Sequence, residues 1–175
     1  RERALAVTTI DRFIKLNPSS PVLDYAMYLR GVINFNDDRG FLGNVANQDL
    51  SERDNQAARD AYQAFKQLIE QFPDSKYAVD SRVRMDYIVN SLGEYEVHVA
   101  RYYFNRGAYL AAANRAQFAV AEYPRVPAAE EALYLLMLSY DKLGLEQLRD
   151  DTKRVMTQNF PTSLYLSDGL RARQR

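Results

Sequence analysis

The stretch RGAYLAAANRAQFAVAEYP, residues 106–124, has a glycine near its start, an alanine-rich middle and a proline at its end. Each residue type has a physical role in a helix pair. Glycine readily adopts the left-handed conformation that ends a helix. Alanine lets two helix backbones approach closely, and proline stops a helix because it lacks an N–H. The stretch therefore predicts a turn, then a tightly packed helix, then that helix's end.

The same spacing recurs along the chain. Pro18, Pro73, Pro124 and Pro161 each follow a run with helical character. Alanine lies 12 residues before the first three prolines, and glycine lies 17 residues before the last two. The order of these residues is typical of tetratricopeptide repeats, which have a period of about 34 residues. The sequence therefore predicts an all-α fold, a tetratricopeptide-repeat solenoid of antiparallel helix pairs.

The repeat bounds follow from the prolines. We expect a single array over residues 1–175, made of a partial repeat (1–18), repeats at about 19–73, 74–124 and 125–161, and a C-terminal tail (162–175). The first wide spacing predicts an inserted loop near 34–54, followed by a helix that begins near Ser51 or Asp54. The second predicts a lengthened helix around 89–107, with Gly93 as a weak point. The first run resembles a second helix, so we expect its partner helix to precede Arg1 in a longer protein.

Composition excludes several classes of function. The 23 basic and 23 acidic residues cancel, so there is no cationic excess to grip nucleic acid. The chain has no cysteine, which excludes a disulfide scaffold, a thiolate zinc site and a cysteine nucleophile. No apolar run approaches the roughly 20 residues of a membrane-spanning helix.

No catalytic, cofactor-binding or metal-binding set is evident in the sequence. His98 is the sole histidine, and no HExxH motif surrounds it. The acidic residues between 37 and 54 do not have the alternate spacing of a calcium loop. We therefore expect a protein that is not an enzyme.

Three pairs of residues are candidates for binding a protein partner. Phe41 and Leu42 are apolar residues in a polar segment, so they either tuck back onto the array or dock a partner. Tyr102 and Tyr103 fit either inter-repeat packing or a binding hot spot. Asn114 and Arg115 interrupt an apolar helix. They are either solvent-exposed, or Arg115 offers its guanidinium to a carboxylate of a partner. These three pairs are Phe41 and Leu42, Tyr102 and Tyr103, and Asn114 and Arg115.

Longer motifs carry a family resemblance across nearly the whole chain. They are TIDRFIKLNP (9–18), DYAMYLRG (24–31), GFLG (40–43), DLSERD (49–54), FPDSKY (72–77), YEVHVARYYFNRGA (95–108) and NRAQFAVAEYP (114–124). In these motifs the chain resembles the ComL/YfiO family of outer-membrane assembly lipoproteins, the BamD family. The resemblance implies a solenoid of five tetratricopeptide repeats. It also implies a lipidated N-terminal cysteine upstream of this chain, anchoring the protein to the periplasmic face of the outer membrane.

The resemblance also implies partners. They are the POTRA domains of BamA, the lipoproteins BamC and BamE, and unfolded outer-membrane proteins that the family's N-terminal repeats recognise. Nucleic acid is not expected, and contact with the membrane is expected through the lipid anchor alone. Asn114 and Arg115 match the family's NR motif at the BamA interface. The segment LYLSDGLRARQR (164–175) departs from the family pattern and is interpreted as a tail beyond the last helix.

The function implied is that of a non-catalytic scaffold in outer-membrane protein assembly. Two other interpretations remain. The first is a generic tetratricopeptide adaptor or co-chaperone that binds peptides in its groove. The second is a helical-repeat enzyme whose catalytic residues lie outside this chain.

Overall fold

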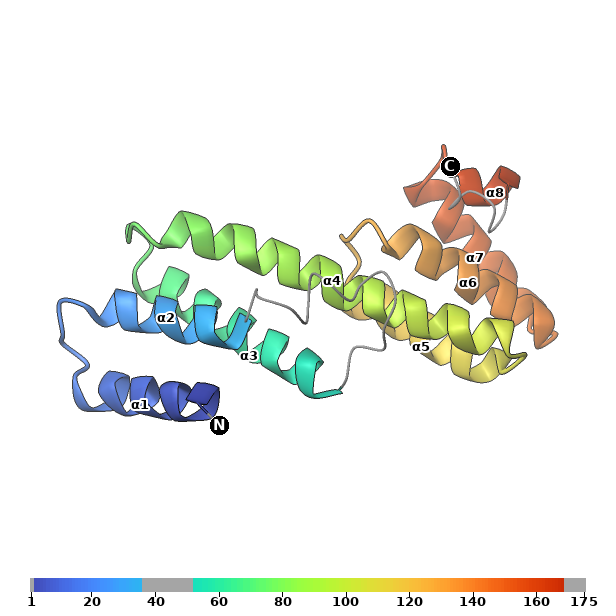
Figure 1. Cartoon of the computed structure of the whole chain (residues 1–175). Coiled ribbons are helices and arrows are strands. Elements are labelled where there is room, and N and C mark those ends of the chain that lie inside the picture. Colours follow the sequence, from blue (N-terminus) through green and yellow to red (C-terminus); the bar gives the residue numbers. More distant parts are fainter. Residues whose placement is uncertain (1, 36–51, 169–175) are drawn as a thin grey trace. The chain divides into compact units, whose positions relative to one another are not determined.

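The computed structural model describes residues 2–35 and 52–168, and within these ranges all regular secondary structure is helical (Figure 1). The predicted all-α repeat fold is confirmed. Phe41, Leu42 and most of the predicted insertion lie outside the described residues. Among the described helices, none combines the length and the apolar character that spanning a bilayer requires. The helices are α1 (Glu2–Leu16), α2 (Leu23–Phe35), α3 (Glu52–Gln71), α4 (Ala78–Asn105), α5 (Tyr109–Glu122), α6 (Ala129–Lys142), α7 (Glu146–Asn159) and α8 (Leu164–Asp168).

The chain divides into two compact units, Arg1–Ser91 and Leu92–Arg175, with the division inside α4. In the first unit, α1 packs against α2 and α2 against α3. In the second, α6 packs against α5, α7 and α8. The start of α3 at Glu52 confirms the predicted helix start near Ser51 or Asp54, and the 28-residue length of α4 confirms the predicted lengthened helix.

Pro18, Pro73, Pro124 and Pro161 each lie in a connection between two helices, which we call a corner. The four corners have the same backbone hydrogen bonds. Helices α1, α3, α5 and α7 each end two residues before their proline, as the repeat spacing predicts. At every corner the amide two residues after the proline donates to the carbonyl just before it. The amide five residues after the proline donates to the carbonyl of the residue two positions after the proline. The donor–acceptor pairs are Ser20–Asn17 and Leu23–Ser20, Ser75–Phe72 and Ala78–Ser75, Val126–Tyr123 and Ala129–Val126, and Ser163–Phe160 and Leu166–Ser163.

The two predicted glycine turns are left-handed helix ends. Gly107 has φ +76° and Gly144 has φ +71°. The amide after each glycine reaches back to a carbonyl in the last helical turn, with Ala108 donating to Tyr103 and Leu145 to Tyr140. This is the Schellman arrangement, which satisfies carbonyls that the helix itself leaves unpaired.

The core of the first unit explains the alanine, phenylalanine and glycine of its motifs. Ala61 and Phe65 of α3 are both fully buried, as the A-x3-F spacing predicts. A Cβ on Gly31 of α2 would overlap the Phe65 ring, so glycine is what lets α2 approach α3 there. A neighbouring cluster contains Leu23, Met27, Leu68 and Ala78, packed against Ile14, Tyr28, Ile69, Phe72 and Tyr77.

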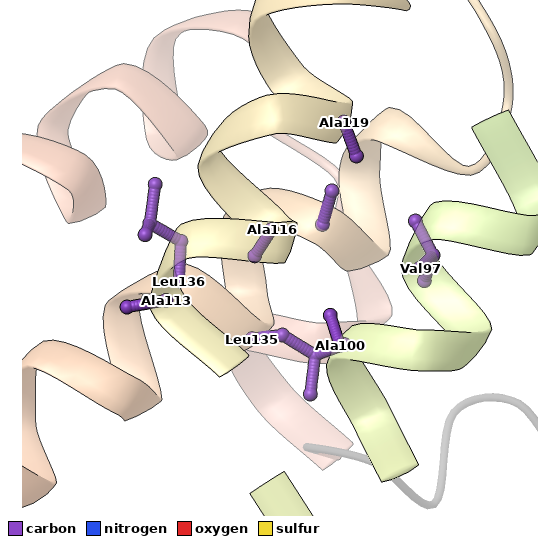
Figure 2. Close-up of a cluster of buried hydrophobic side chains, with 8 residues drawn as sticks. Val97, Ala100, Ala113, Ala116, Ala119, Leu135 and Leu136 are labelled. Atoms are coloured by element: carbon purple, nitrogen blue, oxygen red, sulfur yellow. The ribbon is translucent and has the colours of Figure 1, made fainter. Parts of the chain in front are cut away.

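The core of the second unit is built largely from alanine (Figure 2). Ala113, Ala116 and Ala119 line one face of α5 and pack against α4 and α6. Small side chains allow the three helix backbones to lie close together, which answers why the quoted stretch is alanine-rich. The other members of this cluster are Val97 and Ala100 from α4 and Ala132, Leu135 and Leu136 from α6.

Two sequence interpretations are corrected. Gly93 lies within α4 with no break in the helix, and a Cβ there would press on Val126 and Tyr123, so its role is close packing rather than weakness. The segment after Pro161 was expected to be a tail beyond the last helix. Instead, the fourth corner has the hydrogen bonds of the other three and leads into α8.

Candidate protein-docking site

Helix α5 presents an exposed face opposite its alanine face. Leu110, Asn114 and Phe118 are spaced four residues apart, so they share one side of the helix. Leu110 is 63% exposed and Phe118 is 37% exposed, and Asn114 lies exposed between them. Arg115 flanks this stripe. We call these four residues, Leu110, Asn114, Arg115 and Phe118, the α5 docking face.

Arg115 is held by an internal partner. Its Nη1 donates a hydrogen bond of 3.1 Å to Oε2 of Glu96 on α4. The Glu96 side chain is 6% exposed, whereas that of Arg115 is 48% exposed. A guanidinium has five N–H donors, so this bond fixes Arg115 without using its whole hydrogen-bonding capacity. Arg115 can therefore neutralise a buried carboxylate and still face solvent.

Tyr102 and Tyr103 lie side by side at the C-terminal end of α4, with ring centroids 5.7 Å apart and an edge-to-face tilt. Tyr102 is 51% exposed, and the Arg106 guanidinium lies 5.1 Å from its ring centre. Tyr103 is half-buried. Tyr103 lies seven residues after Glu96, so these two share a face of α4, whereas Tyr102 points to a different side.

The three predicted pairs of binding residues thus differ in their structural surroundings. Asn114 and Arg115 are brought together with exposed apolar neighbours. Tyr102 and Tyr103 lie at one end of α4 and contact each other, but no contact to the α5 docking face is seen among the described side chains. Phe41 and Leu42 lie outside the described residues, so the proposal for them stands on sequence alone.

Sequence reasoning missed the acidic partners. Glu96 and Glu131 are both buried, and each pairs with an arginine from a neighbouring helix. A signal for Glu96 was present, because it falls on the buried face of α4 with Leu92, Val97 and Ala100. A charge on an apolar helical face requires a partner, since an unpaired buried carboxylate is costly. Leu110 and Phe118 were also missed, although their spacing around Asn114 places them on one face.

No set of three or more histidine and acidic side chains that could hold a metal ion occurs in the described residues. His98 is exposed. The α5 docking face offers apolar area, an amide and a guanidinium, which are groups for contact with another protein.

Comparison with known proteins identifies the family. A model of the YfiO family, described as an outer membrane lipoprotein, matches residues 1–156. The chain belongs to the YfiO family. The match takes in α1 to α6 and most of α7, including the whole α5 docking face.

Several YfiO relatives share the name outer membrane protein assembly factor BamD. The relative from Neisseria meningitidis serogroup A is 51% identical over 95% of this chain and 62% of its own length. The relative from serogroup B of the same species is 49% identical over 98% of this chain and 64% of its own length. The relative from Xylella fastidiosa strain Temecula1 is 39% identical over 92% of this chain and 55% of its own length. This chain therefore spans less than two thirds of the length of these YfiO relatives.

Proposed function

We propose that this chain is part of a non-catalytic scaffold that assists the assembly of outer-membrane proteins. It would dock the POTRA domains of BamA and the lipoproteins BamC and BamE. The full-length protein would lie at the periplasmic face of the outer membrane through a lipid anchor upstream of this chain. The repeats at 19–73, 74–124 and 125–161 would then form one array that presents helix faces to these partners. The names of the YfiO relatives support the assembly role.

The observation that carries the docking proposal is the α5 docking face. Its apolar residues, Leu110 and Phe118, are exposed on a helix whose other side is fully packed. Aromatic and arginine side chains supply much of the binding energy in protein interfaces. Arg115 is also pre-positioned by Glu96, so a partner would meet an arginine that has already lost part of its conformational freedom.

The mechanism requires no bond-making step. Phe118 and Leu110 would bury apolar area, while Asn114 and the free donors of Arg115 would bind polar groups of the partner. Because the chain's net charge is zero, attraction of a partner would come from local groups such as Arg115 rather than from the overall field.

The test is binding of this chain to purified BamA POTRA domains by isothermal titration calorimetry. Phe118→Ala and Leu110→Ala should each weaken binding by about 1–2 kcal/mol, while Asn114→Ala should have a smaller effect. Leu148→Ala is the matched control, because Leu148 is similarly exposed on α7, away from the α5 docking face. It should bind as the unaltered chain does.

Equal weakening by Leu148→Ala and Phe118→Ala would place the interface elsewhere. Absence of binding by the folded chain would remove this chain from the BamA contact. A generic peptide-binding adaptor would then be the better account, to be tested with unstructured peptides in place of the POTRA domains.

A further inference from the structure

A buried carboxylate at the C-terminal end of the second unit joins three helices. Oε1 of Glu131 on α6 accepts a hydrogen bond of 2.6 Å from Nε of Arg101 on α4, and Nη2 of the same arginine forms an ion pair with it at 2.5 Å. Oε2 of Glu131 accepts a hydrogen bond of 3.2 Å from the hydroxyl of Tyr165 on α8. The Glu131 side chain is 9% exposed. Each oxygen of this carboxylate therefore has its own partner helix.

The Tyr165 ring also has a partner on α6, in addition to the hydrogen bond of its hydroxyl. It lies 5.4 Å from the ring of Tyr134, which is one turn after Glu131 on α6. Burial, with the Glu131 charge and hydrogen bond, raises the pKa of Tyr165 to about 12. Beyond the ring, a concavity is lined by Met137, Leu138 and Asp141 of α6, Arg149 and Lys153 of α7, and Leu166 of α8.

The Tyr165 side chain attaches helix α8 to α6. Helix α8 has five residues, too few to be stable without tertiary contacts. Leu164, Leu166 and Ser167 are exposed, whereas Tyr165 is half-buried. The backbone around it satisfies itself locally, since the Tyr165 amide donates to Oγ of Ser163 and the Leu166 amide to the Ser163 carbonyl. Release of Tyr165 would therefore free α8 without breaking a helix of the core.

The receiving surface does not depend on α8 for its shape. Arg101 holds Glu131 from the opposite side, and Tyr134 is an integral part of α6. An acceptor oxygen, an aromatic wall and the α6 and α7 side of the adjoining concavity thus remain in place when α8 leaves. These features select an aromatic ring that carries a hydroxyl donor, which is the side chain of tyrosine.

We propose that Glu131, Tyr134 and Arg101 form a tyrosine-binding subsite, which α8 fills in its own chain and which docks a tyrosine-bearing helical turn of a partner protein. Glu131 accepts the phenol hydrogen, Tyr134 packs against the ring, and Arg101 is the positioning residue that holds Glu131. The apolar neighbours of Tyr165, Leu164 and Leu166, show the kind of segment that fits. Partner binding and α8 binding at this subsite are mutually exclusive.

The subsite is separate from the α5 docking face and does not rest on the function proposed above. The YfiO family match ends at residue 156, before α8 begins. The match to the Neisseria meningitidis serogroup B relative takes in 171 residues of this chain. At most four residues remain outside it, so α8 lies inside. The segment that holds Tyr165 thus falls within the match to this relative but lies beyond the part matched by the family model.

The test uses a capped peptide, FPTSLYLSD, with the sequence of residues 160–168, titrated into the 175-residue chain. Binding is followed by NMR at the amides of Tyr134 and Leu138. The Tyr165→Ala chain should bind the peptide at least about tenfold more tightly than the unaltered chain, because α8 no longer competes. A peptide with phenylalanine in place of tyrosine should bind the Tyr165→Ala chain about tenfold more weakly, since it cannot donate to Glu131. Tyr25→Ala, which alters an exposed tyrosine of the first unit, should leave peptide binding as in the unaltered chain.

A second measurement uses hydrogen exchange and needs no added peptide. In a Tyr165→Phe chain the Leu166 amide should exchange about tenfold faster than in the unaltered chain, while amides of α6 should be unchanged. The proposal fails if the tyrosine and phenylalanine peptides bind the Tyr165→Ala chain equally, or if neither binds. It also fails if the unaltered chain and Tyr165→Ala bind the peptide equally, or if exchange at Leu166 is unaffected by Tyr165→Phe.

Discussion

Arg115 on α5 donates to a carboxylate, that of Glu96 on α4, which is almost completely shielded from water. The same arginine is therefore both a structural partner and a candidate contact for another protein. A charge reversal such as Arg115→Glu would place two carboxylates together and disturb the fold as well as any interface. Experiments on this residue have to separate the two roles.

We expect Arg115→Ala to lower the free energy of unfolding by about 1–3 kcal/mol, because it leaves Glu96 buried without its partner. The double variant Arg115→Ala with Glu96→Gln should recover most of that loss, since the amide is neutral. Arg125→Ala, an exposed arginine in the same unit, should change stability little. Urea unfolding followed by circular dichroism compares the three variants with the unaltered chain. Failure of the double variant to recover stability would mean that Glu96 is not the reason for the loss.

The alanine face of α5 should not tolerate enlargement. Ala116→Leu is expected to destabilise the chain by about 1–3 kcal/mol or more, because Ala116 is fully buried among α4, α5 and α6. Ala121→Leu lies on the exposed side of the same helix and should be nearly neutral. Thermal unfolding of the two variants compares the same change in volume on opposite faces. Similar melting temperatures would show that the helices do not approach as closely as described.

Gly31→Ala tests a close approach. In an exposed helix interior, replacing glycine with alanine raises the free energy of unfolding by about 1 kcal/mol. At Gly31 the new methyl group would overlap the Phe65 ring, so we expect a loss of about 1–3 kcal/mol instead. Gly107→Ala meets no neighbour but must adopt a positive φ, so its cost should be about 1 kcal/mol of backbone strain. Denaturant unfolding decides the sign, and a stabilised Gly31→Ala chain would refute the account of α2–α3 packing.

The stability of the first unit should depend on pH through Asp80. Burial raises its pKa, but hydrogen bonds from Arg84 and Tyr28 and the charge of Arg84 outweigh burial, so the pKa lies below its ordinary value of 3.8. A carboxyl with a lowered pKa contributes stability above its ordinary value, and that contribution is lost as pH falls through the lowered one. Unfolding measured from pH 5 to pH 2.5 should therefore show a smaller acid dependence in Asp80→Asn than in the unaltered chain. Asp74→Asn, at an exposed site, is the control, and an equal reduction by both would contradict the prediction.

The structural features that the sequence predicts well are those that depend on the local properties of single residues. Prolines, left-handed glycines and the alanine face have local physical causes, so helix ends and the buried side of α5 follow from spacing alone. Glu96 and Glu131 differ, because their pairing depends on which helices become neighbours. Gly93 was misjudged for the same reason, since Val126 and Tyr123 reach it from another part of the chain.

Helix α8 was missed because the motif before it is degenerate. Arg149 stands where the other copies have alanine, and Thr157 stands where they have an aliphatic residue. The pattern therefore predicted no further helix after Pro161. The corner at Pro161 nevertheless keeps the hydrogen bonds of the earlier corners. The backbone geometry of the corner is thus kept at Pro161, although the side-chain pattern that identifies the other repeats is lost there.

The corner hydrogen bonds join residues no more than four apart in the chain. Closing a corner therefore costs little loop entropy, and folding can begin at any of the four and spread to its neighbours. The segment 125–161, which has 37 residues, is then a unit that could be duplicated in register. Such a protein should fold with an added helix pair, so evolution could lengthen or shorten this chain by whole repeats.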